Sequence, residues 1–527
     1  MAAGLVPLVC YAMTLARTIT WRNGGIDSGD AATGAAVLGV LHPPGYALYV
    51  TVAHLTVRLL PWVEPAGAVA WLGALGGTAA AVVVYWSARV ILADGWAQAT
   101  VADAAGGEVV APLQPRAGGG DSVRLDVMAA VAAAWAVALG PLWWRQSNLP
   151  TVHAFNLLFA AILGAIVARV TTRGWFRRWA VAGALVTALA ATHHLTLLAI
   201  PLALAVALIG FDRGALRALR GAVDRVLIAR LVAALMVGIL PWVGLIVLAA
   251  RRPVHLWGDP SSVGGFIDVV LAQQYQEYLA YPTALGTVYR AALGFWTIAR
   301  EMGVIGFPAA MAGLALTWER RRVYGAFVLA LAAVLVAFFA RYAARDVESY
   351  LLPVAVAAAP MAAVGVRALF GMGTIQRWPL RATGVAILGL VLVAGTGIGL
   401  SYRDMDLHSD RAALDYARGV LAEAPPNALI VSETDLATFS LWYVRLALGE
   451  RPDTAVVDRW MVAWPWYRAH VERVYSDIRM PDAVLSGRAL ASGQVTARPV
   501  VVTNADANWD VPIERGRLVH RIAPSAG

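Results

Sequence analysis

Two acidic residues, Asp27 and Asp30, lie three positions apart in a short polar segment that follows the first apolar stretch of the chain. Paired carboxylates at this spacing could supply a general base and a second group that orients a hydroxyl for deprotonation. The same Asp-Ser-Gly-Asp segment is also ordinary loop chemistry, since aspartate caps helices and stabilises turns. The two residues alone leave both interpretations open.

Other polar and aromatic residues are candidates for binding a substrate. His42 and Tyr46 frame a segment in which two prolines fix the backbone and a glycine permits a sharp turn. Arginines on the external side, where the positive-inside rule disfavours basic residues, would bind a phosphate bidentately, with lipid headgroups or pairing to Asp346 and Glu348 as near-equal alternatives. The candidates besides the carboxylate pair are His42, Tyr46, Arg145, His193, His194, Trp257, Asp259, Tyr275, Arg345, Glu348 and Tyr350.

The sequence does not call for a metal or an organic cofactor. Cys10 is the only cysteine, so the chain has no thiol pair. His193 and His194 are adjacent and would point about 100° apart on a helix, so they rarely bind one ion together. We therefore expect no cofactor, with a divalent metal possible but not required.

The elements that must position these residues are membrane spans. Of the 527 residues, 59% are hydrophobic and only 14% are charged, with a mean hydropathy of +0.64. A soluble chain carries roughly 25% charged residues, so this composition indicates an α-helical polytopic membrane protein. The net charge of +9 is more typical of basic cytoplasmic loops than of nucleic-acid binding, and we expect no nucleic-acid partner.

Charge-free runs near the ~20 residues that cross a bilayer mark the spans. They predict about eleven transmembrane helices, at 3–20, 66–88, 127–144, 154–171, 179–192, 195–211, 231–250, 302–317, 323–340, 350–366 and 383–400.

Four arginine-rich loops fix the orientation, because basic loops stay in the cytoplasm. This rule places the N-terminus inside and favours a hairpin that turns at His193 and His194. It also favours an interfacial helix at 46–62, whose polar residues share one face. Residues 93–125 then form a flexible cytoplasmic loop, and 21–65 form the first external loop. All the candidate site residues fall on the external side.

The composition changes after residue 400. Helical patterns near 409–423 and 435–448 alternate with strand patterns at 428–432, 454–458, 499–503 and 518–522. The chain therefore divides into a transmembrane domain, 1–400, and an extracytoplasmic α/β domain, 401–527.

Several of these segments resemble one known family. Asp27-Ser28-Gly29-Asp30, followed by Leu38-Gly39-Val40-Leu41-His42-Pro43-Pro44-Gly45-Tyr46, is similar to the opening motif of the transmembrane protein O-mannosyltransferase-like family. That family belongs to the GT-C class of polyprenyl-phosphate-sugar glycosyltransferases. Further matches are Trp257-Gly258-Asp259-Pro260, Tyr350-Leu351-Leu352-Pro353, Leu441-Trp442-Tyr443 and Arg451-Pro452-Asp453.

The resemblance implies a GT-C fold and an acidic residue of the first external loop as catalytic base, Asp27 first and Asp30 second. The family usually has Glu at the position of Asp30. The implied reaction is inverting transfer of a mannose-like hexose from a polyprenyl-phosphate donor to a hydroxyl of an external acceptor, such as a protein Ser or Thr.

Two other functional classes stay open at this stage. A transporter or flippase of a lipid-linked glycan would need charged groups along a pathway between the spans. A non-catalytic membrane scaffold would use the C-terminal domain to bind a protein or glycan partner. The Ala, Gly, Val and Arg bias without Lys suggests a high-GC bacterial genome, so we expect the plasma (inner) membrane as the location.

Overall fold

The structure is a computed structural model that describes residues 2–93, 120–173, 177–212, 214, 217, 221, 223–279, 283–344, 347–370 and 379–522. Six helices of the described part are long and apolar enough to cross a membrane, and a seventh candidate is a bent helix pair. Three shorter apolar helices accompany them. The chain is therefore a multi-pass membrane protein, while the number of eleven spans stays a prediction. The predicted loop at 93–125 falls almost entirely outside the described residues.

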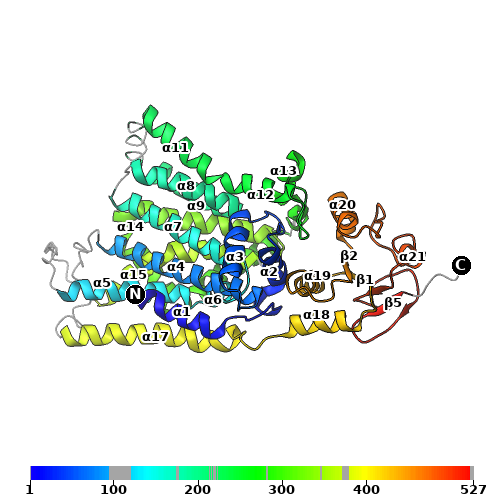
Figure 1. The fold of residues 1–527 in the computed structure, drawn as a ribbon. Coiled ribbons are helices and arrows are strands. Elements are labelled where there is room, and N and C mark those ends of the chain that lie inside the picture. The colour runs from blue at the N-terminus through cyan, green and yellow to red at the C-terminus, as the bar shows by residue number, and fades with distance from the viewer. Residues whose placement is uncertain are drawn as a thin grey trace, which may run out of the picture.

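Figure 1 shows the helices of the bundle running roughly parallel, with the C-terminal domain, in orange and red, at one end. The long or bent elements of the bundle are α4 (Pro65–Ala93), α5 (Gly120–Ala138) with α6 (Pro141–Asn148), α7 (His153–Arg173), α11 (Arg225–Gly238) with α12 (Leu240–Ala250), α14 (Ala284–Arg341), α15 (Leu352–Phe370) and α17 (Pro379–Met405). The shorter helices are α1 (Ala2–Thr14), α2 (Ser28–Val37), α3 (Ala47–Leu59), α8 (Arg177–His193), α9 (Ala199–Phe211) and α13 (Val263–Val270).

Helix breaks occur where the sequence removes backbone hydrogen bonds or permits unusual dihedrals. Gly140 and Pro141 separate α5 from α6, which bend by 71°. Within α14 the backbone leaves the helical region at Gly303, where φ is 71°, and again at Arg321. The break predicted at the histidine pair is present, since α8 ends at His193 and a 3-10 turn follows.

The structure also corrects some predicted boundaries. The helix α1 ends at Thr14 instead of continuing to residue 20, and α14 begins at Ala284, well before the predicted span at 302–317. The interfacial segment forms α3, in agreement with the predicted helix. The segment that carries Asp30 was expected to be a loop and is the short helix α2.

The C-terminal domain contains the expected alternation of helices and strands. Its sheet has the order β2-β1-β3-β5-β4, with β1 (Leu429–Ser432) parallel to both β2 (Ala455–Asp458) and β3 (Val500–Val502). The antiparallel edge consists of β5 (His520–Ile522) and β4 (Ile513–Glu514). The helices are α18 (Ala412–Glu423), α19 (Asp435–Trp442), α20 (Pro465–Val474) and α21 (Gly487–Ala491).

The helix α19 joins this domain to the membrane bundle. The Trp21 indole donates to Ser440 Oγ at 3.0 Å, and the Tyr443 hydroxyl donates to Glu64 at 2.7 Å. Gly29 of α2 packs so closely on α19 that a Cβ there would lie 2.4 Å from the Phe439 carbonyl oxygen. Apolar residues of both domains accordingly form one continuous buried cluster. Figure 1 shows α2 and α19 together at this junction.

Candidate active site

Asp30 is the centre of a buried hydrogen-bond network at the junction of the two domains. Its side chain is inaccessible to solvent. One carboxylate oxygen accepts from His42, through Nδ1 at 2.6 Å and the backbone N–H at 3.3 Å. The other accepts from His255 Nε2 at 2.8 Å and Trp257 Nε1 at 3.0 Å. Two donors thus point at each oxygen, so the carboxylate of Asp30 is engaged by its neighbours within the protein.

The backbone brings these partners together across more than two hundred residues. Val40 forms a parallel β-bridge with Leu256, and the Val40 N–H donates to the His255 carbonyl at 3.0 Å. Gly39 permits this approach, because a Cβ there would lie 2.7 Å from the His255 carbonyl oxygen. The bridge therefore directs the side chains on both sides of Leu256 toward Asp30 in α2.

His42 connects Asp30 to Asp27. Its Nε2 lies 3.8 Å from a carboxylate oxygen of Asp27, while its Nδ1 binds Asp30. Burial lowers the pKa of the imidazole, but the charges of Asp27 and Asp30 outweigh burial and raise this pKa to about 9. His42 is therefore an imidazolium at neutral pH. Burial raises the pKa of Asp30, but the hydrogen bonds from His255 and His42 outweigh burial and hold this pKa far below the usual range.

Of the two carboxylates that flank His42, Asp27 is the one that is accessible to solvent. It occupies the position before the first turn of α2, but its side chain makes no capping hydrogen bond. About a third of the side chain, 35%, is exposed. Partial burial raises the pKa of Asp27, an effect that the positive charge of His42 opposes. A carboxylate that is partly accessible and has a raised pKa is more basic than an ordinary aspartate and is suited to accept a proton.

Asp27 faces a cavity of about 740 Å³ between the bundle and the C-terminal domain. Aromatic side chains form much of its wall, and burial raises the pKa of the Tyr46 and Tyr275 hydroxyls, which therefore stay protonated. The polar residues along the cavity are Asp27, His42, Tyr46, His153, His194, Thr196, Tyr275, Gln276, Tyr278, Tyr342, Tyr350, Glu433, Thr434 and Asp435.

Two histidines line the cavity together with Tyr350. The Nδ1 atom of His194 accepts from the backbone N–H of Thr196 at 3.3 Å, and Nδ1 of His153 lies 3.2 Å from the Asn156 amide nitrogen. A neutral ring bonded in this way carries its proton on Nε2. The His194 and Tyr350 rings are 4.8 Å apart. This part of the wall therefore offers N–H and O–H donors suited to an anion.

The remaining sequence candidates that the structure describes are not among the residues that line the cavity. Arg145 is 3.8 Å from Glu348, two residues before Tyr350, and its buried Nε has no hydrogen-bond partner among the described residues. The ring of His193 lies 5.3 Å from that of Tyr46, and its Nε2 is 3.2 Å from the Val152 carbonyl oxygen. Asp259 pairs with Arg252 at 3.3 Å, away from the cavity. Arg345 lies outside the described residues.

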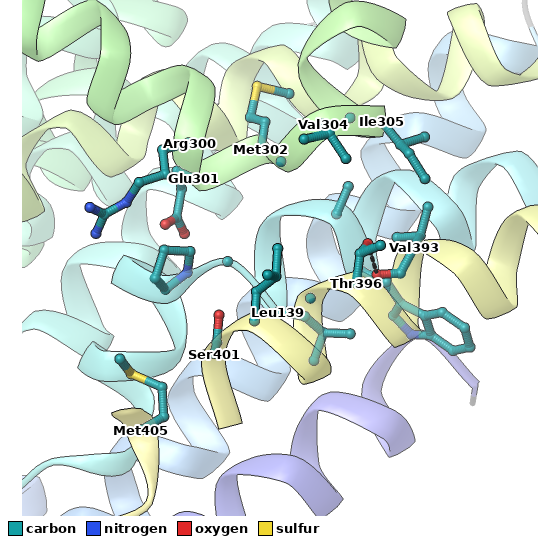
Figure 2. Close-up of a pocket in the computed structure, with 18 of the residues that line it drawn as sticks. Leu139, Arg300, Glu301, Met302, Val304, Ile305, Val393, Thr396, Ser401 and Met405 are labelled. Atoms are coloured by element: carbon teal, nitrogen blue, oxygen red, sulfur yellow. Dashed lines mark hydrogen bonds between the residues drawn. The ribbon is translucent and has the colours of Figure 1, made fainter. Parts of the chain in front are cut away.

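Figure 2 shows a second cavity, of about 320 Å³, between α5, α14 and α17. Glu301 and Arg300 lie at one end of it, and mainly apolar side chains line the rest. The two carboxylate oxygens of Glu301 accept the backbone N–H groups of Leu142, at 2.7 Å, and Trp143, at 2.9 Å, at the start of α6. Because a carboxylate stabilises a helix N-terminus, Glu301 has a structural role there, and the larger cavity is the candidate site.

Comparison with known proteins gives the same family that the motifs suggested. The family model described as the N-terminal domain of the protein O-mannosyl-transferase TMEM260 matches residues 27–213. The mouse protein O-mannosyl-transferase TMEM260 is 26% identical over 490 residues, which cover 89% of this chain and 64% of the mouse protein. The Dictyostelium discoideum protein of the same name is 21% identical over 525 residues, covering 90% and 59%. The chain thus spans about three fifths of these relatives.

Solved structures share the fold. ArnT from Cupriavidus metallidurans in the apo state has a TM-score of 0.60 at 13% identity, covering 99% of this chain and 96% of ArnT. The same protein bound to undecaprenyl phosphate has a TM-score of 0.53 at 14% identity, covering 86% and 88%. The fold is therefore of the GT-C type. The resemblance to the O-mannosyltransferase-like GT-C family is confirmed.

The region that matches the TMEM260 family model begins at Asp27 and contains Asp30, His42, His153 and His194. Sequence reasoning missed several residues of the site, among them His153, His255, Glu433, Thr434 and Asp435. His255 is two residues before the Trp257 motif, a proximity that could have drawn attention to it. The two acidic residues follow the predicted strand at 428–432, and the end of a parallel strand is a common place for a binding residue.

Among the residues that the structure describes, no group of three or more His, Cys, Asp or Glu side chains is arranged to hold a metal ion. The expectation that a metal is not required therefore stays a prediction.

Proposed function

We propose that this protein is a membrane glycosyltransferase that transfers a mannose-like hexose from a polyprenyl-phosphate donor to a hydroxyl of an acceptor, with inversion. The observation that carries the proposal is Asp27, a partly exposed carboxylate that faces the 740 Å³ cavity and lies beside the His42 imidazolium. The names of the relatives and the undecaprenyl phosphate bound to ArnT support the class of donor and acceptor.

In the proposed reaction, Asp27 removes the proton of the acceptor hydroxyl. The hydroxyl oxygen forms a bond to the anomeric carbon of the sugar while the bond from that carbon to the phosphate oxygen breaks. The electron pair leaves with the lipid phosphate, which needs no proton at neutral pH. Asp30 acts as a positioning residue, since it fixes the ring of His42, and that ring in turn faces Asp27.

The donor phosphate is proposed to lie near His153, His194 and Tyr350. These residues offer N–H and O–H donors, and donors placed where negative charge develops stabilise the departing phosphate. Arg145 would add a positive charge behind Tyr350, because its buried Nε is without a described partner. We place this site on the external face of the plasma membrane, which follows from the arginine-rich loops on the other side.

Asp27→Asn tests the proposal. The purified chain in lipid nanodiscs is supplied with radiolabelled mannosyl-phosphoryl-polyprenol and a threonine-containing peptide, and released lipid phosphate and labelled peptide are measured. The amide keeps the size of the side chain but removes the base, so we expect turnover to fall by about 10²–10⁴-fold. The melting temperature should fall only slightly, because Asp27 makes no capping bond and the variant loses only its charge interaction with His42 at 3.8 Å.

Wild-type rates in Asp27→Asn would exclude this residue as the base. A protein that moves the intact lipid-linked sugar across a vesicle membrane, without releasing lipid phosphate, would instead be a flippase.

A further inference from the structure

The C-terminal domain contributes one wall of the cavity. Glu433, Thr434 and Asp435 follow directly after β1 and line the cavity opposite the bundle. The Thr434 hydroxyl accepts from the backbone N–H of Ala437 and thereby caps α19. This cap holds the segment between β1 and α19 in a fixed position, so the two acidic residues beside Thr434 are presented to the cavity by a rigid element.

The topology of the sheet independently marks this position. β1 is the central strand of the parallel part, with β2 on one side and β3 on the other. The chain passes from β1 through α19 to β2 and later returns to pair β3 with the opposite edge of β1. Such a change of direction opens a crevice at the carboxyl ends of the two strands, where ligands of open α/β sheets bind. Glu433 lies at that end of β1.

The acidic groups on this wall have unused acceptor capacity. Oε1 of Glu433 lies 2.5 Å from Arg459, but its Oε2 is buried without a hydrogen-bond partner in the described part of the chain. A buried carboxylate oxygen without a donor is unfavourable unless a ligand or water supplies one. Asp435 is exposed and, within the described residues, has no ion pair. With Asp27, this end of the cavity has three carboxylates, and the other end has His153 and His194.

We infer that the wall formed by Glu433, Thr434 and Asp435 binds the acceptor, and that it selects a polypeptide with an arginine or lysine beside the hydroxyl that receives the sugar. A cationic side chain would provide the donors that Glu433 Oε2 and Asp435 lack, and it would place the neighbouring hydroxyl near Asp27. The inference rests on the proposed function and deepens it by naming the acceptor class.

The test measures peptide binding directly and does not depend on transfer. Two nonapeptides with one central threonine, flanked by arginine in one and by glutamate in the other, are titrated against the full chain in nanodiscs. Hydrogen bonds to charged groups justify an expected preference of at least tenfold for the arginine-flanked peptide. Asp435→Asn and Glu433→Gln should each reduce this preference to about threefold or less, whereas Glu450→Gln should leave it unchanged. Glu450 is a matched control, since it pairs with Arg418 in the same domain away from the cavity.

Asp435 is exposed, so its variant is expected to fold even if Glu433→Gln loses stability through the Arg459 pair. Equal affinity for the two peptides, no peptide binding, or an unchanged preference in Asp435→Asn would overturn the inference. If the two variants bound mannosyl-phosphoryl-polyprenol more weakly but bound the peptides unchanged, the wall would be a binding site for the sugar donor, and the inference would also be overturned. Selective binding of the arginine-flanked peptide without any transfer of sugar would refute the proposed function but would still support peptide binding at this wall.

Discussion

Replacing Asp30 by asparagine should destabilise the protein more than it impairs the chemical step. Four donors point at the two carboxylate oxygens of Asp30: two from His42, one from His255 and one from Trp257. Asparagine keeps one of these oxygens and replaces the other by an NH₂ group. The backbone N–H of His42 and the indole N–H of Trp257 can only donate, and each faces a different oxygen. In either orientation the amide therefore directs its NH₂ at a donor.

The expected loss in the free energy of unfolding follows from the number of hydrogen bonds that Asp30→Asn removes. Two donors lose their acceptor in a fully buried position, at about 1–3 kcal/mol each. The His42 imidazolium also loses its closest counter-charge, and breaking a buried pair by removing one partner costs about 3–5 kcal/mol. These values overlap and are not additive, so we expect a loss of about 3–5 kcal/mol. At roughly 2 °C per kcal/mol for a large domain, the melting temperature should fall by about 6–10 °C.

The assay is thermal unfolding in nanodiscs, followed by tryptophan fluorescence, with turnover measured on the same sample below the melting temperature. Asp259→Asn is the control, because Asp259 is a partly exposed aspartate paired with Arg252 outside the cavity. It should change the melting temperature by about 2 °C or less. If Asp30→Asn melts like the wild type, the network does not stabilise the junction. If it also loses turnover, Asp30 acts in the chemistry directly.

Three further predictions concern the junction, pH dependence and the donor phosphate. Gly29→Ala should lower the melting temperature, because its Cβ would lie 2.4 Å from the Phe439 carbonyl oxygen and such overpacking costs about 1–3 kcal/mol. An unchanged melting curve would argue against close packing of α19 on α2. The pKa of His42 is raised from 6.5 to about 9, so the charged ring stabilises the folded protein fully below pH 6.5, and this stability is lost as pH rises through 9. Melting temperatures measured across this range should show the loss, and His42→Gln should remove the pH dependence. His194→Gln and Arg145→Lys should each raise the KM for the donor with little change in melting temperature. Unchanged KM values would show that the donor phosphate does not bind at these residues.

The sequence by itself determined the class of the protein and the approximate order of its elements. Apolar runs near the thickness of a bilayer can only be buried in lipid or in a helical bundle, so composition alone indicated membrane spans. Local alternation of apolar residues located the strands β1, β2 and β3, because it acts over a few positions. The break at the histidine pair followed from placing the arginine-rich loops on one side of the membrane. The boundaries at α1 and α14 were wrong, because hydropathy does not register where a helix ends: α1 stops within its apolar run, and α14 begins well before the run predicted to be a span.

The candidate site was predicted only in part, for a physical reason. Asp27 and Asp30 have the same chemistry and are three residues apart, so local sequence could not tell them apart. Tertiary structure separates them, because α2 turns Asp30 into the junction, where His255 and Trp257 saturate its oxygens, and leaves Asp27 facing the cavity. Likewise Asp435 reaches the cavity only because α19 packs on Gly29. Contacts between residues hundreds of positions apart depend on the docking of whole elements, and no local pattern encodes them.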